Sequence, residues 1–277
     1  MPLFPRSDGH LLKKLPHALR IQSIRSPRRS DSVAFIRQEF DITETIEFIR
    51  SYNQDPDRRP DQSISLFYLL ACSGVRMLTR RPEMNRFISS SRFYQRREIR
   101  ISFETRRTIA DEPLMVSFSA DPRAALPEIA GQIRSGIRET VAEPARPRRS
   151  NPIPIPHRLR KFGAVIFRAM DSANLIPPGA MRHDPDFSSV KIYTSGGTAP
   201  EAPLYPPENR GTCGITAVLG TMRKAWRFDE GGRKQRRDLV QLTIGYDRRI
   251  ADDLYVEASI DLLRHLIQDP EPLLSSD

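Results

Sequence analysis

The feature that most constrains the fold is a change of hydrophobic period near the end of the chain. Apolar and polar residues alternate over 240–246, the pattern of a strand with one buried face. From Val256 the apolar residues fall on one helical stripe instead, and Pro270 ends it. Five charges lie in the seven residues between the two: Asp247, Arg248, Arg249, Asp252 and Asp253. A strand must therefore lead almost directly into a helix through a charged turn.

This charged turn has two interpretations. Asp252 and Asp253 stand at the start of the helix, where the helix dipole favours carboxylates. The charges could form a solvated turn, or they could form a site. Because runs of charge usually face water, the pattern alone favours the solvated turn.

The order of the remaining patterns predicts an α+β fold, a mixed sheet flanked by helices. Asp41 and Glu44 have the spacing of a capping box for the second helix. The helix at 63–81 is apolar nearly all round at its start, so we expect it to be central and buried. Strands are predicted at 33–40, 86–88, 92–94, 98–105, 114–118, 188–194, 213–219, 225–228 and 239–246, and helices at 11–19, 41–52, 63–81, 126–141, 159–174 and 256–267.

The domain organisation follows from composition along the chain. Residues 1–30 are a basic arm with little periodicity. Residues 31–277 read as one domain, because strand and helix patterns continue on both sides of a Pro/Arg-rich crossover at 144–157. The prolines prevent that crossover from being helical.

Composition argues against several classes of function. The net charge is +10, but the arginines are scattered and form no recognition helix or basic strand interleaved with aromatic residues, so we do not expect a nucleic-acid partner.

The longest apolar run, 64–75, is too short to cross a membrane. The five histidines have no metal-ligand spacing, so no metal is expected. Cys72 and Cys213 read as buried, reduced thiols of a cytoplasmic protein.

Three motifs resemble the catalytic domain of the dihydrolipoamide acyltransferases of 2-oxo acid dehydrogenase complexes. Residues 81–86, Arg-Pro-Glu-Met-Asn-Arg, are similar to the family's Pro-x-Leu-Asn after a helix. Residues 193–197, Tyr-Thr-Ser-Gly-Gly, resemble its Ser/Thr-Asn-x-Gly segment. Residues 247–253 resemble Asp-His-Arg-x-x-Asp-Gly, and 269–274 resemble the closing Asn/Asp-Pro-x-x-Leu-Leu. The likeness covers roughly 33–274.

The resemblance implies a chloramphenicol-acetyltransferase-like fold and CoA-dependent acyl transfer. Coenzyme A or acyl-CoA would be a co-substrate, with no cofactor permanently bound, and the acyl group would move to or from a thiol. The chain looks like a free-standing catalytic domain, without the family's lipoyl and subunit-binding domains. Because the family forms trimers with active sites at subunit interfaces, a homotrimer is also implied.

The family's general base is missing. In the family, the histidine of Asp-His-Arg removes the thiol proton, but Arg248 stands in its place, and guanidinium stays protonated at physiological pH. Loss of a general base typically costs about 10²–10⁴-fold in rate. The glycine that ends the family motif is replaced by Asp253 in this chain. By position, Thr194, with Ser195 beside it, would donate to the oxyanion of the tetrahedral intermediate.

Few residues could replace the base. Asp247 and Asp252 are carboxylates in the same turn, although pairing with the neighbouring arginines is the plainer interpretation. His157 and His183 are isolated histidines, which usually face solvent.

Arg248 itself could anchor a carboxylate, a phosphate or an acyl-CoA headgroup, or it could form a salt bridge with Asp252 or Asp253 that locks the turn. Two hypotheses follow. The chain is either an acyltransferase of reduced or altered activity, or a catalytically silent relative that binds acyl-CoA, regulates or supports assembly.

Overall fold

The computed structural model describes residues 5–57, 59–106, 113–142, 157–195, 201–229 and 231–276. Nearly all of the predicted crossover at 144–157 lies outside these residues.

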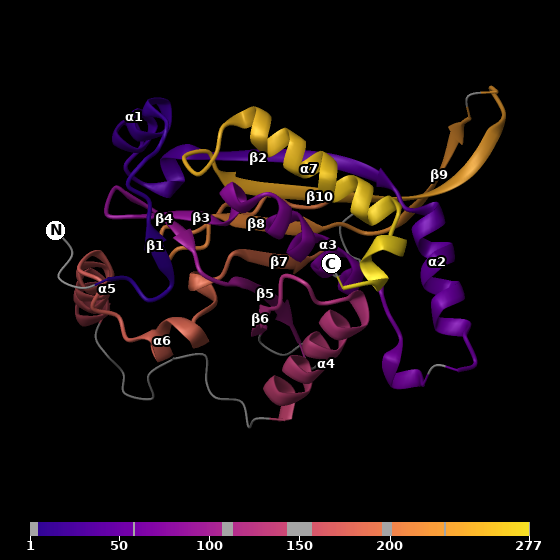
Figure 1. The fold of residues 1–277 in the computed structure, drawn as a ribbon, viewed down its shortest axis with the longest axis horizontal. Coiled ribbons are helices and arrows are strands. Elements are labelled where there is room, and N and C mark those ends of the chain that lie inside the picture. The colour runs from indigo at the N-terminus through magenta and orange to yellow at the C-terminus, as the bar shows by residue number, and fades with distance from the viewer. Residues whose placement is uncertain are drawn as a thin grey trace.

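The centre of the molecule is a seven-stranded mixed sheet in the order β2-β10-β8-β7-β5-β6, with β9 paired to β10 (Figure 1). β7 is parallel to both β5 and β8, and the other neighbours are antiparallel. The mixed sheet was predicted, and it is confirmed. The strands are β2 (Val33–Asp41), β5 (Ile99–Thr105), β6 (Leu114–Ala120), β7 (Val190–Thr194), β8 (Ile215–Leu219), β9 (Arg223–Phe228) and β10 (Lys234–Asp247).

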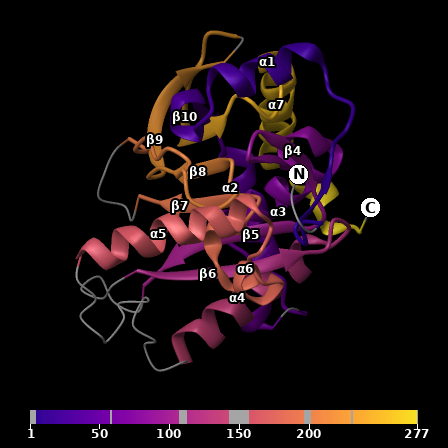
Figure 2. The same ribbon diagram turned by 90° about the vertical axis from the view of Figure 1, so that its left-hand side faces the viewer.

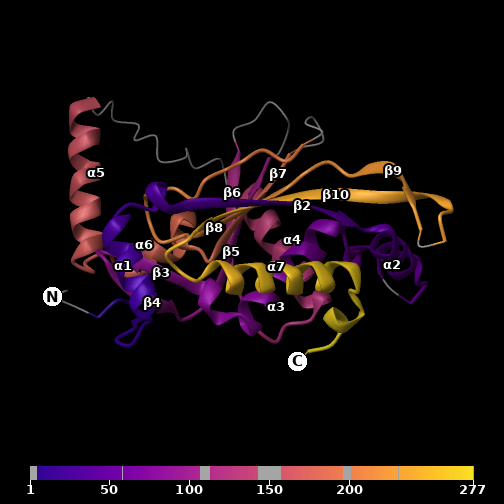
Figure 3. The same cartoon turned by 90° about the horizontal axis from the view of Figure 1, so that it is seen from above.

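Helices pack on one face of this sheet because its strands alternate. One row across the sheet, in register, is apolar: Phe103, Ile192, Ala217 and Ile244. These side chains join the main core beneath α2 (Thr43–Gln54), α3 (Leu66–Arg80), α4 (Leu126–Ala142) and α7 (Asp253–Gln268) (Figure 3). As predicted, α3 is the most buried of these helices, with nine buried residues.

The opposite face of the sheet is polar, and residues 201–211 lie across it. The next row in register is Ser102, Lys191, Thr216 and Gly245. Thr216 donates to the carbonyl of Tyr205. A Cβ at Gly245 would lie 2.7 Å from Thr216 Oγ1, so glycine permits this close approach.

The N-terminal arm supplies the first strand of a small second sheet, β1-β4-β3, formed by β1 (Gly9–Leu11), β4 (Arg92–Arg96) and β3 (Arg86–Ser89). The helix predicted at 11–19 is misplaced. Residues 9–11 pair with β4, and α1 (His17–Arg25) begins only after Pro16, which a helix interior does not tolerate.

The capping box predicted at Asp41 and Glu44 is also wrong. Asp41 is still paired with Leu239 at the end of β2, so its backbone belongs to the strand. Its carboxylate instead accepts from the backbone N–H and hydroxyl of Thr43, at 3.0 and 2.6 Å.

Two parts project from this body. The hairpin of β9 and the first half of β10 extends past the sheet at one end (Figures 1 and 3). At the other end lie α5 (His157–Ser172) and α6 (Pro178–His183) (Figure 2). Short 3₁₀ turns complete the fold at Arg29–Ser32, Pro60–Gln62, Pro82–Asn85, Pro185–Phe187 and Glu271–Leu274. Among the described residues, no helix has the length and hydropathy that a membrane span requires.

Candidate active site

The charged turn lies between β10, which ends at Asp247, and α7, which begins at Asp253. Asp252 is the N-cap of α7, and its Oδ1 accepts a 2.9 Å hydrogen bond from the backbone N–H of Tyr255. This bond satisfies one of the N–H groups that have no partner inside the helix. The carboxylate of Asp252 is therefore engaged in starting the helix.

Arg248 forms a two-pronged ion pair with Asp253. Its Nη2 lies 2.6 Å from Asp253 Oδ2, and its Nε lies 3.2 Å from Oδ1. Both side chains are about half exposed, at 46% and 52%. The Tyr246 hydroxyl also donates to Asp253 Oδ1, at 3.3 Å. Of the two interpretations of Arg248, the structure contains the salt bridge, and the partner is Asp253 instead of Asp252.

The ion pair fixes the charge of both residues. The hydrogen bond from Arg248 lowers the pKa of the Asp253 carboxyl, and the same bond raises the pKa of Arg248. Burial raises the pKa of the Tyr246 hydroxyl. At neutral pH the cluster therefore contains a guanidinium, a weakly basic carboxylate and a neutral phenol.

Asp247 is buried and paired with arginines. The sequence favoured this pairing over a catalytic role. Its Oδ1 accepts from Arg249 Nε and the Ser32 hydroxyl, both at 2.8 Å, and its Oδ2 accepts from Arg249 Nη2 at 2.7 Å. Arg249 also donates to the carbonyls of Ser26 and Pro27. With 1% of its surface exposed, Asp247 ties the N-terminal arm to the turn instead of facing a substrate.

Thr194 and Ser195 lie at the other end of the sheet from Arg248. Val190 and Tyr246 are both level with Ile215. Thr194 is four residues beyond Val190, and Arg248 is two residues beyond Tyr246 in the opposite direction. Six residues at about 3.3 Å each separate them by about 20 Å within one chain.

The local contacts of these two hydroxyl residues are modest. Thr194 is exposed at the end of β7. Ser195 donates its backbone N–H to the carbonyl of Leu219 at 2.9 Å, and its hydroxyl lies 3.3 Å from that of Thr221. His157 and His183 belong to α5 and α6, but their side chains lie outside the described part of the structure.

Sequence reasoning missed a group of buried arginines at the same end of the sheet as the turn. Arg29, Arg96 and Arg249 are each less than 10% exposed, and each donates to backbone carbonyls. Burial lowers the pKa of Arg29. The signal in the sequence was the excess of arginine over lysine, which looks like a bias of composition. In this protein the guanidinium groups present their N–H donors in a fork, and they hold loops in place by donating to backbone carbonyls.

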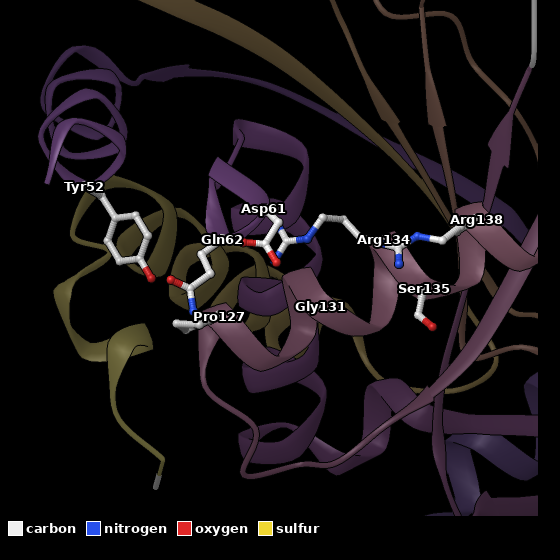
Figure 4. Close-up of a pocket in the computed structure, with 8 residues that line it drawn as sticks. All are labelled: Tyr52, Asp61, Gln62, Pro127, Gly131, Arg134, Ser135 and Arg138. Carbon is white, nitrogen blue, oxygen red and sulfur yellow. The ribbon is translucent and has the colours of Figure 1, made fainter. Parts of the chain in front are cut away.

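Among the described residues, no group of three or more His, Cys, Asp or Glu could hold a metal ion. A cavity of about 470 Å³ lies between α2, residues 60–62 and α4, away from the charged turn (Figure 4). Arg134 extends along this cavity, and its Nη1 donates to the carbonyl of Ser63 at 2.6 Å.

No protein-family model matches the chain, and no curated protein sequence matches it. Solved structures do. Dihydrolipoamide acetyltransferase from Azotobacter vinelandii is similar with a TM-score of 0.59 and 15% identity, over 99% of this chain and all of that one. The cubic core of a pyruvate dehydrogenase multienzyme complex is similar with a TM-score of 0.58 and 14% identity, over 99% and 100%.

A chloramphenicol acetyltransferase is also similar, with a TM-score of 0.57 and 10% identity over 96% of this chain and 100% of that one. At such identities the comparison concerns the fold. The chain has the fold of the dihydrolipoamide acetyltransferase cores and of chloramphenicol acetyltransferase, and the fold predicted from the sequence is confirmed.

Proposed function

We propose that this chain keeps the acyltransferase fold but has lost the step in which a base removes the proton of the attacking thiol. The observation that carries the proposal is the ion pair of Arg248 and Asp253. These two positions are where the sequence departs from the family's Asp-His-Arg-x-x-Asp-Gly motif. The two departures are thus partners in one interaction, and CoA-dependent acyl transfer of the usual kind is expected to be reduced or absent.

The other groups of the turn support this view. A general base must accept a proton near neutral pH and must be able to reach it. Arg248 can only donate, and the lowered pKa of Asp253 makes its carboxylate a poor base. Asp252 caps α7, and Asp247 is buried among its donors. Each carboxylate in the turn therefore already has a structural partner.

The function that remains on such a fold is binding instead of turnover. Acyl-CoA or another acyl thiol is the ligand class we propose, with coenzyme A as co-substrate if any transfer survives. A regulatory or scaffolding role is the alternative that we propose for the same fold. The cytoplasm is the location we propose, because Cys72 and Cys213 are both buried free thiols, as predicted.

A homotrimer is part of this proposal. With about 20 Å between them in one chain, Thr194 and Arg248 could share a site only if it lay between two copies. Exposed apolar side chains are available for an interface: Phe162, Val165 and Ile166 on α5, and Trp226 and Phe228 on β9. One structural neighbour is itself described as a cubic core.

Sedimentation would test the homotrimer. Three copies of a 31.7 kDa chain sum to about 95 kDa, and a stable 31.7 kDa species would contradict a shared site.

An assay that separates free CoA from acyl-CoA by chromatography would test the catalytic part, because acyl transfer to a thiol leaves the total number of thiols unchanged. Wild type, Arg248→His and the double variant Arg248→His/Asp253→Gly would be given a panel of acyl-CoAs with a dithiol acceptor. We expect no turnover above background for wild type. The double variant should gain activity over the single one, because Asp253 would otherwise pair with the new imidazole and hold it away from a thiol.

The matched control is Arg37→His. Arg37 also forms an exposed ion pair, with Glu201 at 3.0 Å, but on β2. Arg37→His should leave the rate of acyl transfer at the wild-type level. Wild-type turnover at an ordinary enzymatic rate that survives Arg248→Ala would overturn the proposal, whereas acyl-CoA binding without turnover would support it.

A further inference from the structure

A second group of charged side chains lines a cavity of about 60 Å³ where the N-terminal arm meets the turn between β4 and β5 (Ile99–Thr105) and helix α6. It lies apart from the Arg248–Asp253 pair and plays no part in the function proposed above. The charged residues that line it are Asp8, Arg96, Arg97, Glu98, Arg100 and Arg182.

The two carboxylates of this cavity are already engaged. Asp8 Oδ1 accepts a hydrogen bond from Arg6 Nε at 2.6 Å, and Asp8 Oδ2 accepts one from Arg6 Nη2 at 3.3 Å. Glu98 Oε2 accepts from the Ser119 hydroxyl at 2.8 Å and from Arg100 Nη2 at 3.1 Å. Each carboxylate is therefore already shared among several donors.

Arg96 is the most deeply placed of those arginines, with 7% of its surface exposed. Its Nη1 donates to the carbonyl of Phe187 at 2.8 Å, and its Nη2 reaches Thr212. Its buried Nε–H has no acceptor in the described part of the chain, and its Nη1 lies 3.9 Å from Asp8 Oδ2. Burial lowers the pKa of Arg96 to about 10, so a further negative charge would stabilise its guanidinium.

The rim of the cavity adds two more cations. Arg97 and Arg182 are exposed, and neither forms a salt bridge within the described residues. Counting the residues that line the cavity, and Arg6 and Asp171 behind it, five arginines face three carboxylates, an excess of two positive charges. The excess equals the charge of one phosphate dianion.

We propose that this cavity binds a single tetrahedral oxyanion of the phosphate type. Guanidinium groups present their N–H donors in a fork that matches phosphate oxygens. A cavity of this size holds a few water molecules, so it has room for one small anion at its open mouth. The phosphate could be the free ion or a monoester group carried by a larger molecule.

Calorimetric titration of the full chain with inorganic phosphate, in chloride buffer, tests the site. We expect one phosphate per chain, and binding weakened at least about tenfold in Arg97→Ala/Arg182→Ala, because each exposed arginine supplies a charge-assisted hydrogen bond. Both residues are at the surface, so the variant should fold, which circular dichroism would verify.

The control is Arg50→Ala/Arg123→Ala, which removes two exposed arginines that do not line this cavity. It should bind phosphate as wild type does. Titration with methyl phosphate distinguishes the sources: equal binding identifies a monoester site, and binding of inorganic phosphate alone identifies a free-ion site. Absence of phosphate binding by wild type, or equal weakening in both double variants, would overturn the proposal.

Discussion

Asp247→Asn should destabilise the chain far more than its conservative chemistry implies. Asn keeps the shape of the side chain and one acceptor oxygen, which can still accept from Ser32. It lacks the charge, and an NH₂ group replaces Oδ2, which now accepts from Arg249 Nη2 at 2.7 Å. The bond from Arg249 Nε to Oδ1, at 2.8 Å, would remain but without a charged acceptor. Arg249 is 2% exposed and Arg29 is 5% exposed, so both guanidinium groups would stay buried without their carboxylate.

The size of the effect follows from those contacts. Each hydrogen bond to a charged group contributes about 1.5–3 kcal/mol, so the lost bond from Nη2 sets a loss of about that size, and the weakened bond from Nε adds to it. Removing one partner of a buried ion pair typically costs about 3–5 kcal/mol. We therefore expect the free energy of unfolding to fall by about 3–5 kcal/mol.

Urea unfolding at one fixed protein concentration measures this difference, because concentration alters the apparent stability of an oligomer. Asp252→Asn is the matched control, five residues further along. Asn caps helices about as well as Asp, so that change should cost only a few tenths of a kcal/mol. A loss below about 1 kcal/mol for Asp247→Asn, or equal losses for both variants, would refute the reasoning about the buried pair.

Two further predictions concern single titratable groups. The hydrogen bond from the Ser119 hydroxyl, and then the charge of Arg100, lower the pKa of Glu98 in the folded chain. The ionised carboxylate therefore stabilises the fold above the unfolded pKa of about 4.3, and this stabilisation is lost as the pH falls through the lower folded pKa. Ser119→Ala should therefore cost stability at pH 6 and much less at pH 2, and equal costs in urea unfolding at both would contradict this. Burial raises the pKa of the Cys72 thiol to about 12, so an aromatic disulfide reagent at pH 8 should label Cys72 only after unfolding, and rapid labelling of the native chain would show that the thiol is not buried.

Much of the fold could be predicted from local patterns. The alternation over 240–246 and the helical stripe from Val256 predicted β10 and α7, because each element buries one face against the same core. Periodicity failed at the N-terminal arm. There Pro16 delays the helix, and residues 9–11 become a strand only through pairing with β4, a contact that no local pattern contains.

The site could be predicted only in part. The position of Arg248 in the turn followed from the motif, but its partner did not, because Asp252 and Asp253 are equally near in sequence. The helix start decides between them: Asp252 turns inward to cap Tyr255 N–H, which leaves Asp253 for Arg248. The separation of Thr194 from Arg248 depends on strand register, which a single sequence does not specify.

The central claim is that Arg248 and Asp253, the two departures from the family motif, are partners in one ion pair. Carboxyl NMR titration of Asp253 tests it most directly. In wild type the pKa of Asp253 should lie below the ordinary value of about 3.9, and in Arg248→Gln it should rise towards that value. An ordinary pKa in wild type that Arg248→Gln leaves unchanged would contradict the claim.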